Sequence, residues 1–113
     1  MRFSVIIPLY NKAPYVAKAI GSVLSQTFTD YELVIMDDGS KDGSFEEASK
    51  CIIGCISCHI YQQSNGGVSM ARNNAVSLSQ GRYLCFLDAD DWWEPTFLEE
   101  NSKLIDEFPN AVI

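Results

Sequence analysis

Apolar residues occur in short blocks along the chain, and four of these blocks have the length of β-strands. The block at residues 83–87 is too short for a helix core and too continuous for a half-exposed strand. Such a run is typical of a strand buried on both faces of a parallel sheet. Similar blocks predict strands at residues 3–7, 33–36 and 58–62.

The segments between these blocks carry apolar residues at helical spacing, which predicts four helices with one face toward the core. Strands and helices therefore alternate, as in an α/β fold with a mostly parallel sheet and helices on its faces. Residues 111–113 resemble the start of another strand. The apolar positions that indicate these helices are Val16, Ile20, Val23 and Leu24, which we expect to pack in the core, then Phe45, Ala48 and Ile52 on an inner face, then Val68, Ala71, Ala75 and Leu78 on one face, and last Phe97, Leu98, Leu104, Ile105 and Phe108.

Polar residues, glycine and proline mark the expected helix ends. Asn11 is the predicted N-cap of the first helix, and Ser44 with Glu47 has the spacing of a capping box for the second. Gly81 is expected to end the third helix and Pro109 the fourth.

The composition is that of one globular domain, residues 1–113, and it limits the kinds of partner. Hydrophobic residues make up 47% of the 113 residues, and the formal net charge is −7. This charge argues against nucleic acid or an anionic membrane as the main partner. An acidic protein that binds a phosphorylated ligand needs positive charge, which a divalent cation would supply. We see neither a run near the ~20 apolar residues of a membrane span nor a signal-peptide layout, so we expect a cytoplasmic protein.

Three of the four cysteines form patterns that occur in iron proteins. Cys51, Cys55 and Cys58 have a radical-SAM spacing, and Cys55, Cys58 and His59 match the pattern of haem attachment. The surrounding residues read as a helix end, a turn at Gly54 and a strand start, which suits neither site. We interpret the cysteines as small hydrophobic residues in a reduced compartment and His59 as a strand residue. A cysteine metalloprotein is the alternative.

Three carboxylates, Asp88, Asp90 and Asp91, follow the predicted strand at residues 83–87. Open α/β sheets bind ligands at the C-terminal ends of their strands. Crowded oxygen donors favour Mg²⁺ or Mn²⁺, usually shared with substrate phosphates. On an extended backbone Asp88 and Asp90 point the same way, so both can address one ligand. The alternative is that Asp90 or Asp91 caps the helix that follows.

A second acidic loop, which contains Asp37 and Asp38, follows the predicted strand at residues 33–36. Its alternative explanation is turn chemistry, because Asp and Gly favour turns. Arg72 lies near the start of the third predicted helix, either as a solvated surface residue or as a cation that meets a phosphate or carboxylate. The sequence contains neither of the usual glycine-rich phosphate loops.

Five short motifs follow one another along the chain. They are residues 4–11 (SVIIPLYN), 25–27 (SQT), 32–40 (ELVIMDDGS), 66–67 with 71–73 (GG and ARN), and 87–91 (LDADD). In this order and with this spacing, they resemble the motifs of the family 2 glycosyltransferases of the GT-A fold. The resemblance implies the N-terminal part of a three-layer α/β/α, Rossmann-like fold. It also implies metal-dependent, inverting transfer of a sugar from a nucleotide-diphosphate-sugar, expected to be a UDP-sugar, to an acceptor hydroxyl in polysaccharide or glycoconjugate biosynthesis.

The resemblance also implies the residues of the site. Asp38 would contact the nucleobase, and a carboxylate can accept the N3–H of uracil, which cytosine lacks in its usual form. Asp88 would contact the ribose or the metal, Asp90 would bind Mn²⁺ or Mg²⁺ directly, and Asp91 would be their neighbour. The implied nucleotide-binding residues are Pro8, Leu9, Tyr10, Asp38, Arg72, Asp88 and Ala89, and the implied metal ligands are Asp90 and Asp88.

The catalytic base of this family is a carboxylate well beyond the Asp-x-Asp motif. Capping and solvation explain Glu94, Glu99 and Glu100 better than base catalysis, since they stand at the front of the last predicted helix. We therefore expect the base beyond Ile113 and interpret the chain as the donor-binding half of a longer enzyme. That enzyme would use a saccharide or lipid-linked acceptor and would be cytoplasmic or peripheral at the inner face of the membrane.

Two other functions are weighed against this one. The chain could be a non-catalytic nucleotide-binding module that acts with a partner, because it shows no later carboxylate. A nucleotidyltransferase would normally have a basic, Gly-rich loop after the first strand, and residues 8–12 are not one. A half enzyme would expose apolar surface and a sheet edge, so we also expect self-association.

Overall fold

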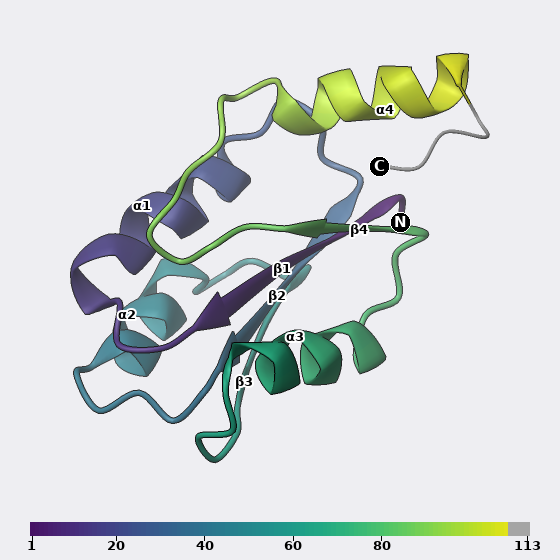
Figure 1. Ribbon diagram of the computed structural model, residues 1–113. Helices are drawn as coiled ribbons and strands as arrows, with labels where there is room; N and C mark the ends of the chain where they lie inside the picture. Colours follow the sequence, from purple (N-terminus) through teal and green to yellow (C-terminus); the bar gives the residue numbers. More distant parts are fainter. Residues whose placement is uncertain (109–113) are drawn as a thin grey trace.

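The computed structural model describes residues 1–108, in which four strands alternate with four helices (Figure 1). All strand pairs are parallel, and the strand order is β3-β2-β1-β4. The predicted α/β class is therefore confirmed, while the strand predicted to start at residue 111 lies outside the described residues. The elements are β1 (Phe3–Leu9), α1 (Ala13–Leu24), β2 (Tyr31–Asp37), α2 (Ser44–Cys51), β3 (Cys58–Gln62), α3 (Val68–Ser77), β4 (Tyr83–Phe86) and α4 (Phe97–Glu107).

The central strands β1 and β2 are buried along their whole length and separate two apolar layers. Because side chains alternate between the faces of a strand, neighbouring residues of β1 enter different layers. Phe3, Val5 and Ile7 pack with α1, α2 and α4, whereas Ile6 packs with Ala71 on the inner face of α3. Figure 1 shows α3 on one face of the sheet and the other helices on the opposite face. The strands are thereby held so that their C-terminal ends share one edge.

The prediction that the fourth strand is buried on both faces is wrong. Strand β4 pairs only with β1 among the described residues, so it forms an edge of the sheet. Its outward side chains, Leu84 and Phe86, remain 38% and 47% exposed. The physical reason is that α3 packs mainly on β1 and β2, so this face of β4 has little helix over it.

The predicted helix caps also differ from those of the structure. The N-cap residue of α1 is Lys12 rather than Asn11, which has a left-handed φ of 49°. Ser44 is the first residue of α2 and forms no capping box, because Gly43 is the N-cap and the Ser44 hydroxyl bonds elsewhere. Helix α3 ends at Ser77, before Gly81.

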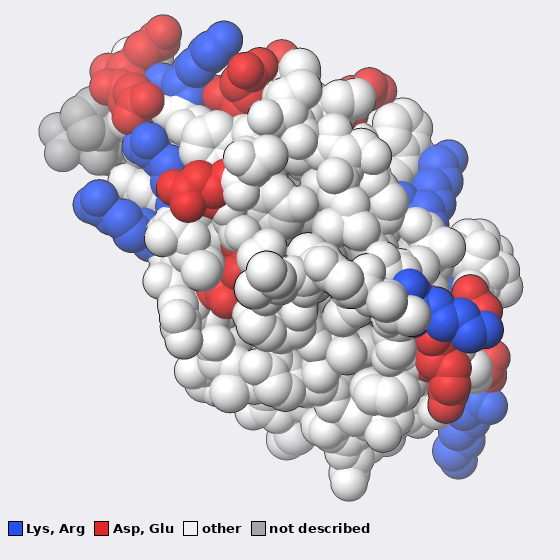
Figure 2. All heavy atoms as spheres, turned by 180° about the vertical axis from the view of Figure 1, so that it is seen from behind, with Lys and Arg blue, Asp and Glu red and all other residues white. Residues whose placement is uncertain are grey.

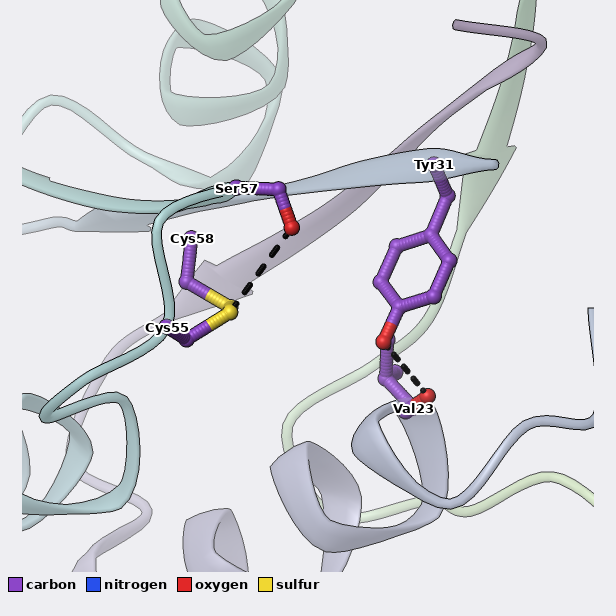
Figure 3. Close-up of a disulfide and its surroundings, with 5 residues drawn as sticks. All are labelled: Val23, Tyr31, Cys55, Ser57 and Cys58. Atoms are coloured by element: carbon purple, nitrogen blue, oxygen red, sulfur yellow. Dashed lines mark hydrogen bonds between the residues drawn. A yellow bond between two sulfur atoms is a disulfide. The ribbon is translucent and has the colours of Figure 1, made fainter. Parts of the chain in front are cut away.

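Two of the cysteines predicted to be reduced are joined. Cys55, in the turn before β3, forms a disulfide with Cys58, the first residue of β3, as Figure 3 shows, while Cys51 and Cys85 are free thiols. Burial raises the pKa of the Cys85 thiol to about 11, so this group is protonated at neutral pH. His59 lies in β3, as predicted. Within residues 1–108, no three His, Cys, Asp or Glu side chains are arranged to hold a metal ion by themselves.

The surface seen from behind carries its charged side chains mostly near the margins, and much of its middle has none (Figure 2). The net negative charge therefore does not form one continuous acidic field over this face. None of the helices in residues 1–108 is long and apolar enough to cross a membrane.

Candidate functional site

A cavity of about 440 Å³ lies where β1, β2 and β4 end and α3 begins. It contains the end of β1, the loop that follows, and the turn after β4. Seven of the predicted site residues line it, which leaves Arg72 beside it and Asp91 outside it. The lining residues are Pro8, Leu9, Tyr10, Lys12, Asp38, Asn65, Gly67, Val68, Ala71, Asp88, Ala89 and Asp90.

The loop after β1 is fixed by the loop after β2. Four hydrogen bonds join residues 11–13 to residues 40–44, and three of the donors are backbone N–H groups of the first loop. The left-handed φ of Asn11 lets its backbone and side chain both reach the second loop. The bonds are Asn11 N–H to Ser40 Oγ (2.9 Å), Lys41 N–H to Asn11 Oδ1 (2.9 Å), Lys12 N–H to Ser44 Oγ (2.8 Å) and Ala13 N–H to Asp42 Oδ2 (3.1 Å).

Asp38 holds the loop between β3 and α3. Its Oδ1 accepts hydrogen bonds from the Gln63 amide and the Gly66 N–H, both at 2.8 Å. Its Oδ2 accepts from the Gly67 N–H at 3.0 Å and the Asn65 amide at 3.2 Å. Burial by itself would raise the pKa of Asp38, but the bonds from Gly66, Gln63 and Gly67 outweigh it and lower the pKa. Asp38 is therefore ionised and already has four donors.

Asp37 is turned into the protein and takes no part in the cavity. Its Oδ2 accepts from the Ser40 N–H at 2.9 Å and the Gln62 amide at 3.1 Å, and its buried Oδ1 has no partner among the described residues. The turn-chemistry alternative thus describes Asp37 but not Asp38, which bonds a distant loop.

Asp88 and Asp90 differ from these two carboxylates because they are open to solvent, with side chains 63% and 49% exposed. Asp88 Oδ1 lies 3.3 Å from an Arg72 guanidinium nitrogen, and Asp90 Oδ2 lies 3.7 Å from Lys12 Nζ. Arg72 is thus an ion-pair partner rather than an isolated surface residue.

The capping alternative for the acidic turn is wrong. Helix α4 begins at Phe97, its N-cap Thr96 makes no side-chain cap bond, and the Leu98 N–H of its first turn donates to Gln26 Oε1 at 2.9 Å rather than to an aspartate. The Asp91 N–H instead donates to the Asp88 carbonyl at 3.0 Å, which closes the turn, and its Oδ1 accepts from the Trp92 N–H at 2.8 Å.

The residues present fit a divalent cation that is coordinated partly by the protein and partly by a substrate. The oxygens of Asp88 and Asp90 are engaged only by exposed cations, whereas backbone N–H groups bind both oxygens of Asp38 and Oδ2 of the inward-facing Asp37. Mg²⁺ is commonly held by one or two carboxylates, with water and phosphate oxygens completing the octahedron. Two available carboxylates meet that requirement, although they do not form an all-protein cage.

The three glutamates weighed as base candidates lie away from the lining of the cavity. Glu99 and Glu100 lie in the first turn of α4, and neither they nor Glu94 lines the cavity. Sequence reasoning missed Lys12, Gln63 and Asn65, because their partners are distant in sequence. The pair Gly66-Gly67 was the available signal that this loop approaches something closely.

Comparison with known proteins identifies the family. The sequence model described as "Glycosyl transferase family 2" matches residues 4–113. The chain is 35% identical over 107 residues to the glycosyltransferase GlyA of Streptococcus pneumoniae, covering 95% of this chain and 15% of that protein. It is 40% identical over 96 residues to the chondroitin synthase of Pasteurella multocida, covering 85% of this chain and 10% of that protein.

The fold is also that of solved structures. Staphylococcus aureus TarS, residues 1–349, in complex with UDP-GlcNAc superposes with a TM-score of 0.90 at 31% identity, covering 96% of this chain and 32% of that one. The chain thus spans less than a third of the length of each of these three proteins. The chain, with its GT-A fold, belongs to glycosyl transferase family 2.

Proposed function

We propose that this chain binds a nucleotide-diphosphate-sugar and that the protein transfers its sugar, with inversion, to an acceptor hydroxyl. The observation that carries the proposal is that Tyr10, Asp38, Asp88 and Asp90 line one and the same cavity in a family 2 chain. The TarS complex with UDP-GlcNAc supports a UDP-sugar as the donor. The relative that is a chondroitin synthase supports a role in polysaccharide biosynthesis.

In this proposal Pro8, Leu9, Tyr10 and Ala89 form the walls of the nucleotide site, and Asp38 meets the nucleobase. Asp38 already accepts from four donors, and an ionised carboxylate has about four lone-pair sites, so a nucleobase donor cannot simply be added to them. The Gly66 and Gly67 N–H groups are fixed by the backbone, whereas the amides of Gln63 and Asn65 can rotate. A uracil N3–H would therefore replace or share one of the side-chain amides.

Asp88 and Asp90 would hold Mn²⁺ or Mg²⁺, and Arg72 would orient Asp88 through their ion pair. When bound, the cation supplies positive charge that stabilises the leaving nucleoside diphosphate. Within residues 1–108, Asp38, Asp88 and Asp90 are the carboxylates that line the cavity, and each already has a role in this proposal. No further carboxylate of the described lining is left to accept the proton of an acceptor hydroxyl. We propose that polypeptide beyond Ile113, in a longer protein, provides one.

The test is calorimetric titration of the chain with UDP, with Mn²⁺ and then with a chelator, repeated for Asp90→Ala. We expect binding that requires Mn²⁺ and that is weakened at least about 10-fold by the substitution, the fold-change of one charged contact. Binding of UDP that ignores both the chelator and the substitution would contradict the metal site.

The absence of a base from the described cavity favours one second candidate, a non-catalytic nucleotide-binding module. It is distinguished by turnover: a protein that binds UDP with Mn²⁺ but never releases UDP from UDP-GlcNAc, with water or saccharides as acceptor, would be such a module.

A further inference from the structure

Lys12 lines the cavity and has no part in the function proposed above. Among the described residues that line the cavity, it alone carries a cationic side chain. Its Nζ lies 3.7 Å from Oδ2 of Asp90, one of the two proposed metal ligands. Lys12 therefore stands where a divalent cation would be expected to act.

The backbone of Lys12 is fixed, but its side chain is not. Its N–H donates to the fully buried Ser44 hydroxyl at 2.8 Å, and its neighbours Asn11 and Ala13 are bonded to the same loop. The side chain, in contrast, is 42% exposed, and within residues 1–108 its one ionic partner is the Asp90 carboxylate. A fixed backbone beneath a long, solvated side chain allows the ammonium to move within the cavity without any change of fold.

The pair that Lys12 forms with Asp90 is one that is easily exchanged. At 3.7 Å it is longer than a hydrogen bond, and both side chains are exposed, so its contribution is small. A divalent cation on Asp90 would repel the ammonium. A diphosphate, which carries more negative charge than one carboxylate, would attract it more strongly.

Charge balance points the same way. The lining contains three carboxylates, Asp38, Asp88 and Asp90, and one ammonium, and the Arg72 guanidinium beside the cavity offsets only Asp88. Adding a diphosphate to this acidic set requires more positive charge than a single divalent cation provides.

We propose that Lys12 is an exchangeable phosphate ligand. It neutralises Asp90 while the cavity is empty, and it pairs with the diphosphate of the donor once a divalent cation occupies Asp90. This inference rests on the proposed function, and it adds that metal and diphosphate binding favour each other through Lys12.

The test compares the 113-residue chain with Lys12→Met, which keeps the aliphatic stem and removes the charge. Calorimetry with UDP in the presence of Mn²⁺ should show affinity lowered about 10- to 100-fold, the usual fold-change for a charged hydrogen bond. Uridine, which has no phosphate, should bind both chains equally. Mn²⁺ alone should bind Lys12→Met more tightly, because Asp90 no longer has a competing cation. A purely structural role would not weaken one ligand and strengthen the other.

Two further variants are the controls. Lys12→Arg should recover most of the UDP affinity, and Lys41→Met, on the neighbouring loop outside the cavity lining, should leave both affinities unchanged. Equal UDP affinity in the parent chain and Lys12→Met would overturn the inference and leave the proposed function standing. Mn²⁺ affinity that is unchanged or weaker in Lys12→Met would overturn the exchange at Asp90. Failure of the parent chain to bind UDP under any condition would overturn both proposals.

Discussion

At the scale of single residues, the surroundings of each carboxylate decide its role. Asp37 and Asp38 are adjacent and chemically identical, yet the first faces the interior and the second holds the loop before α3. Strand alternation separates them, because Asp37 is the last residue of β2 and Asp38 points the other way. Asp88 and Asp90 keep free oxygens because they lie on an exposed turn, which makes these two the candidates for a cation.

We predict that Asp38→Asn destabilises the protein by about 1–3 kcal/mol, the cost of leaving buried hydrogen-bonding groups unpaired. The asparagine amide cannot accept from the Gly66 or Gly67 N–H on its nitrogen side. Urea unfolding at pH 7 measures the difference. Asp106→Asn, at an exposed carboxylate that pairs with Arg2, is the matched control and should change stability by less than about 1 kcal/mol.

The same variant has a pH signature. The pKa of Asp38 in the folded protein lies below its ordinary value of 3.8, so its ionised form stabilises the fold fully above that value. This stabilisation is lost as pH falls through the folded pKa. The stability difference between the parent chain and Asp38→Asn should therefore shrink below about pH 4; a constant difference down to pH 2 would contradict the assignment.

The sequence predicts where Asp88 and Asp90 lie, because their neighbours in the chain already show a strand followed by an acidic turn, and both line the cavity; their role as metal ligands stays a prediction. It does not predict Lys12, Gln63 or Asn65 as site residues. Their roles depend on contacts with Asp90 and Asp38, far along the chain, which exist only after the strands have paired. The pattern of neighbouring residues in the sequence does not predict such long-range contacts.

At the scale of elements, the hydrophobic pattern predicts the positions of strands and helices reliably. It predicts less reliably which other elements pack over them. All eight elements lie where the pattern indicates. The burial of β4 was predicted wrongly, since an apolar run does not reveal whether a helix lies over it. The Ser44 cap was predicted wrongly for a similar reason: the hydroxyl is occupied by Lys12 and Asp42 from outside its own helix.

Gly81, just before β4, has a structural role that is set by tertiary contacts rather than by its neighbours in the chain. Gly81 was interpreted as a helix end, but the structure packs it against β1, where an added Cβ would lie 2.6 Å from the Ser4 nitrogen and the Phe3 carbonyl carbon. Its N–H donates to Ser4 Oγ at 2.8 Å, and the Gln80 N–H donates to the buried Glu32 carboxylate at 2.5 Å. These bonds anchor the strand whose far end carries Asp88.

We predict that Gly81→Ala destabilises the protein by about 1–3 kcal/mol, because overpacking against backbone cannot relax by side-chain rotation. Gly21→Ala is the matched control, since a Cβ on this exposed position of α1 meets nothing within 4 Å. The control should raise stability by up to about 1 kcal/mol through helix propensity. A urea midpoint for Gly81→Ala equal to or above that of the parent chain would show that Gly81 is not tightly packed.

At the scale of the whole molecule, the described sheet stops at β4 with its outer edge unpaired, while most charged groups on the face shown in Figure 2 lie near the margins. Leu84 and Phe86 add apolar side chains to this edge strand. Unpaired strand edges and exposed apolar patches both promote association. We therefore propose that the 113-residue chain associates with itself through β4.

We predict that sedimentation of the 113-residue chain shows a concentration-dependent increase in mass, and that Phe86→Ser shifts the population toward monomer. Phe86 is already half-exposed, so its replacement removes contact surface without creating a cavity. Ile56→Ser is the control, because Ile56 is 96% exposed in the turn between the two bonded cysteines and lies on a different element. Equal effects of the two substitutions would indicate nonspecific hydrophobic association. A parent chain that stays monomeric at high concentration would show that the β4 edge does not mediate self-association.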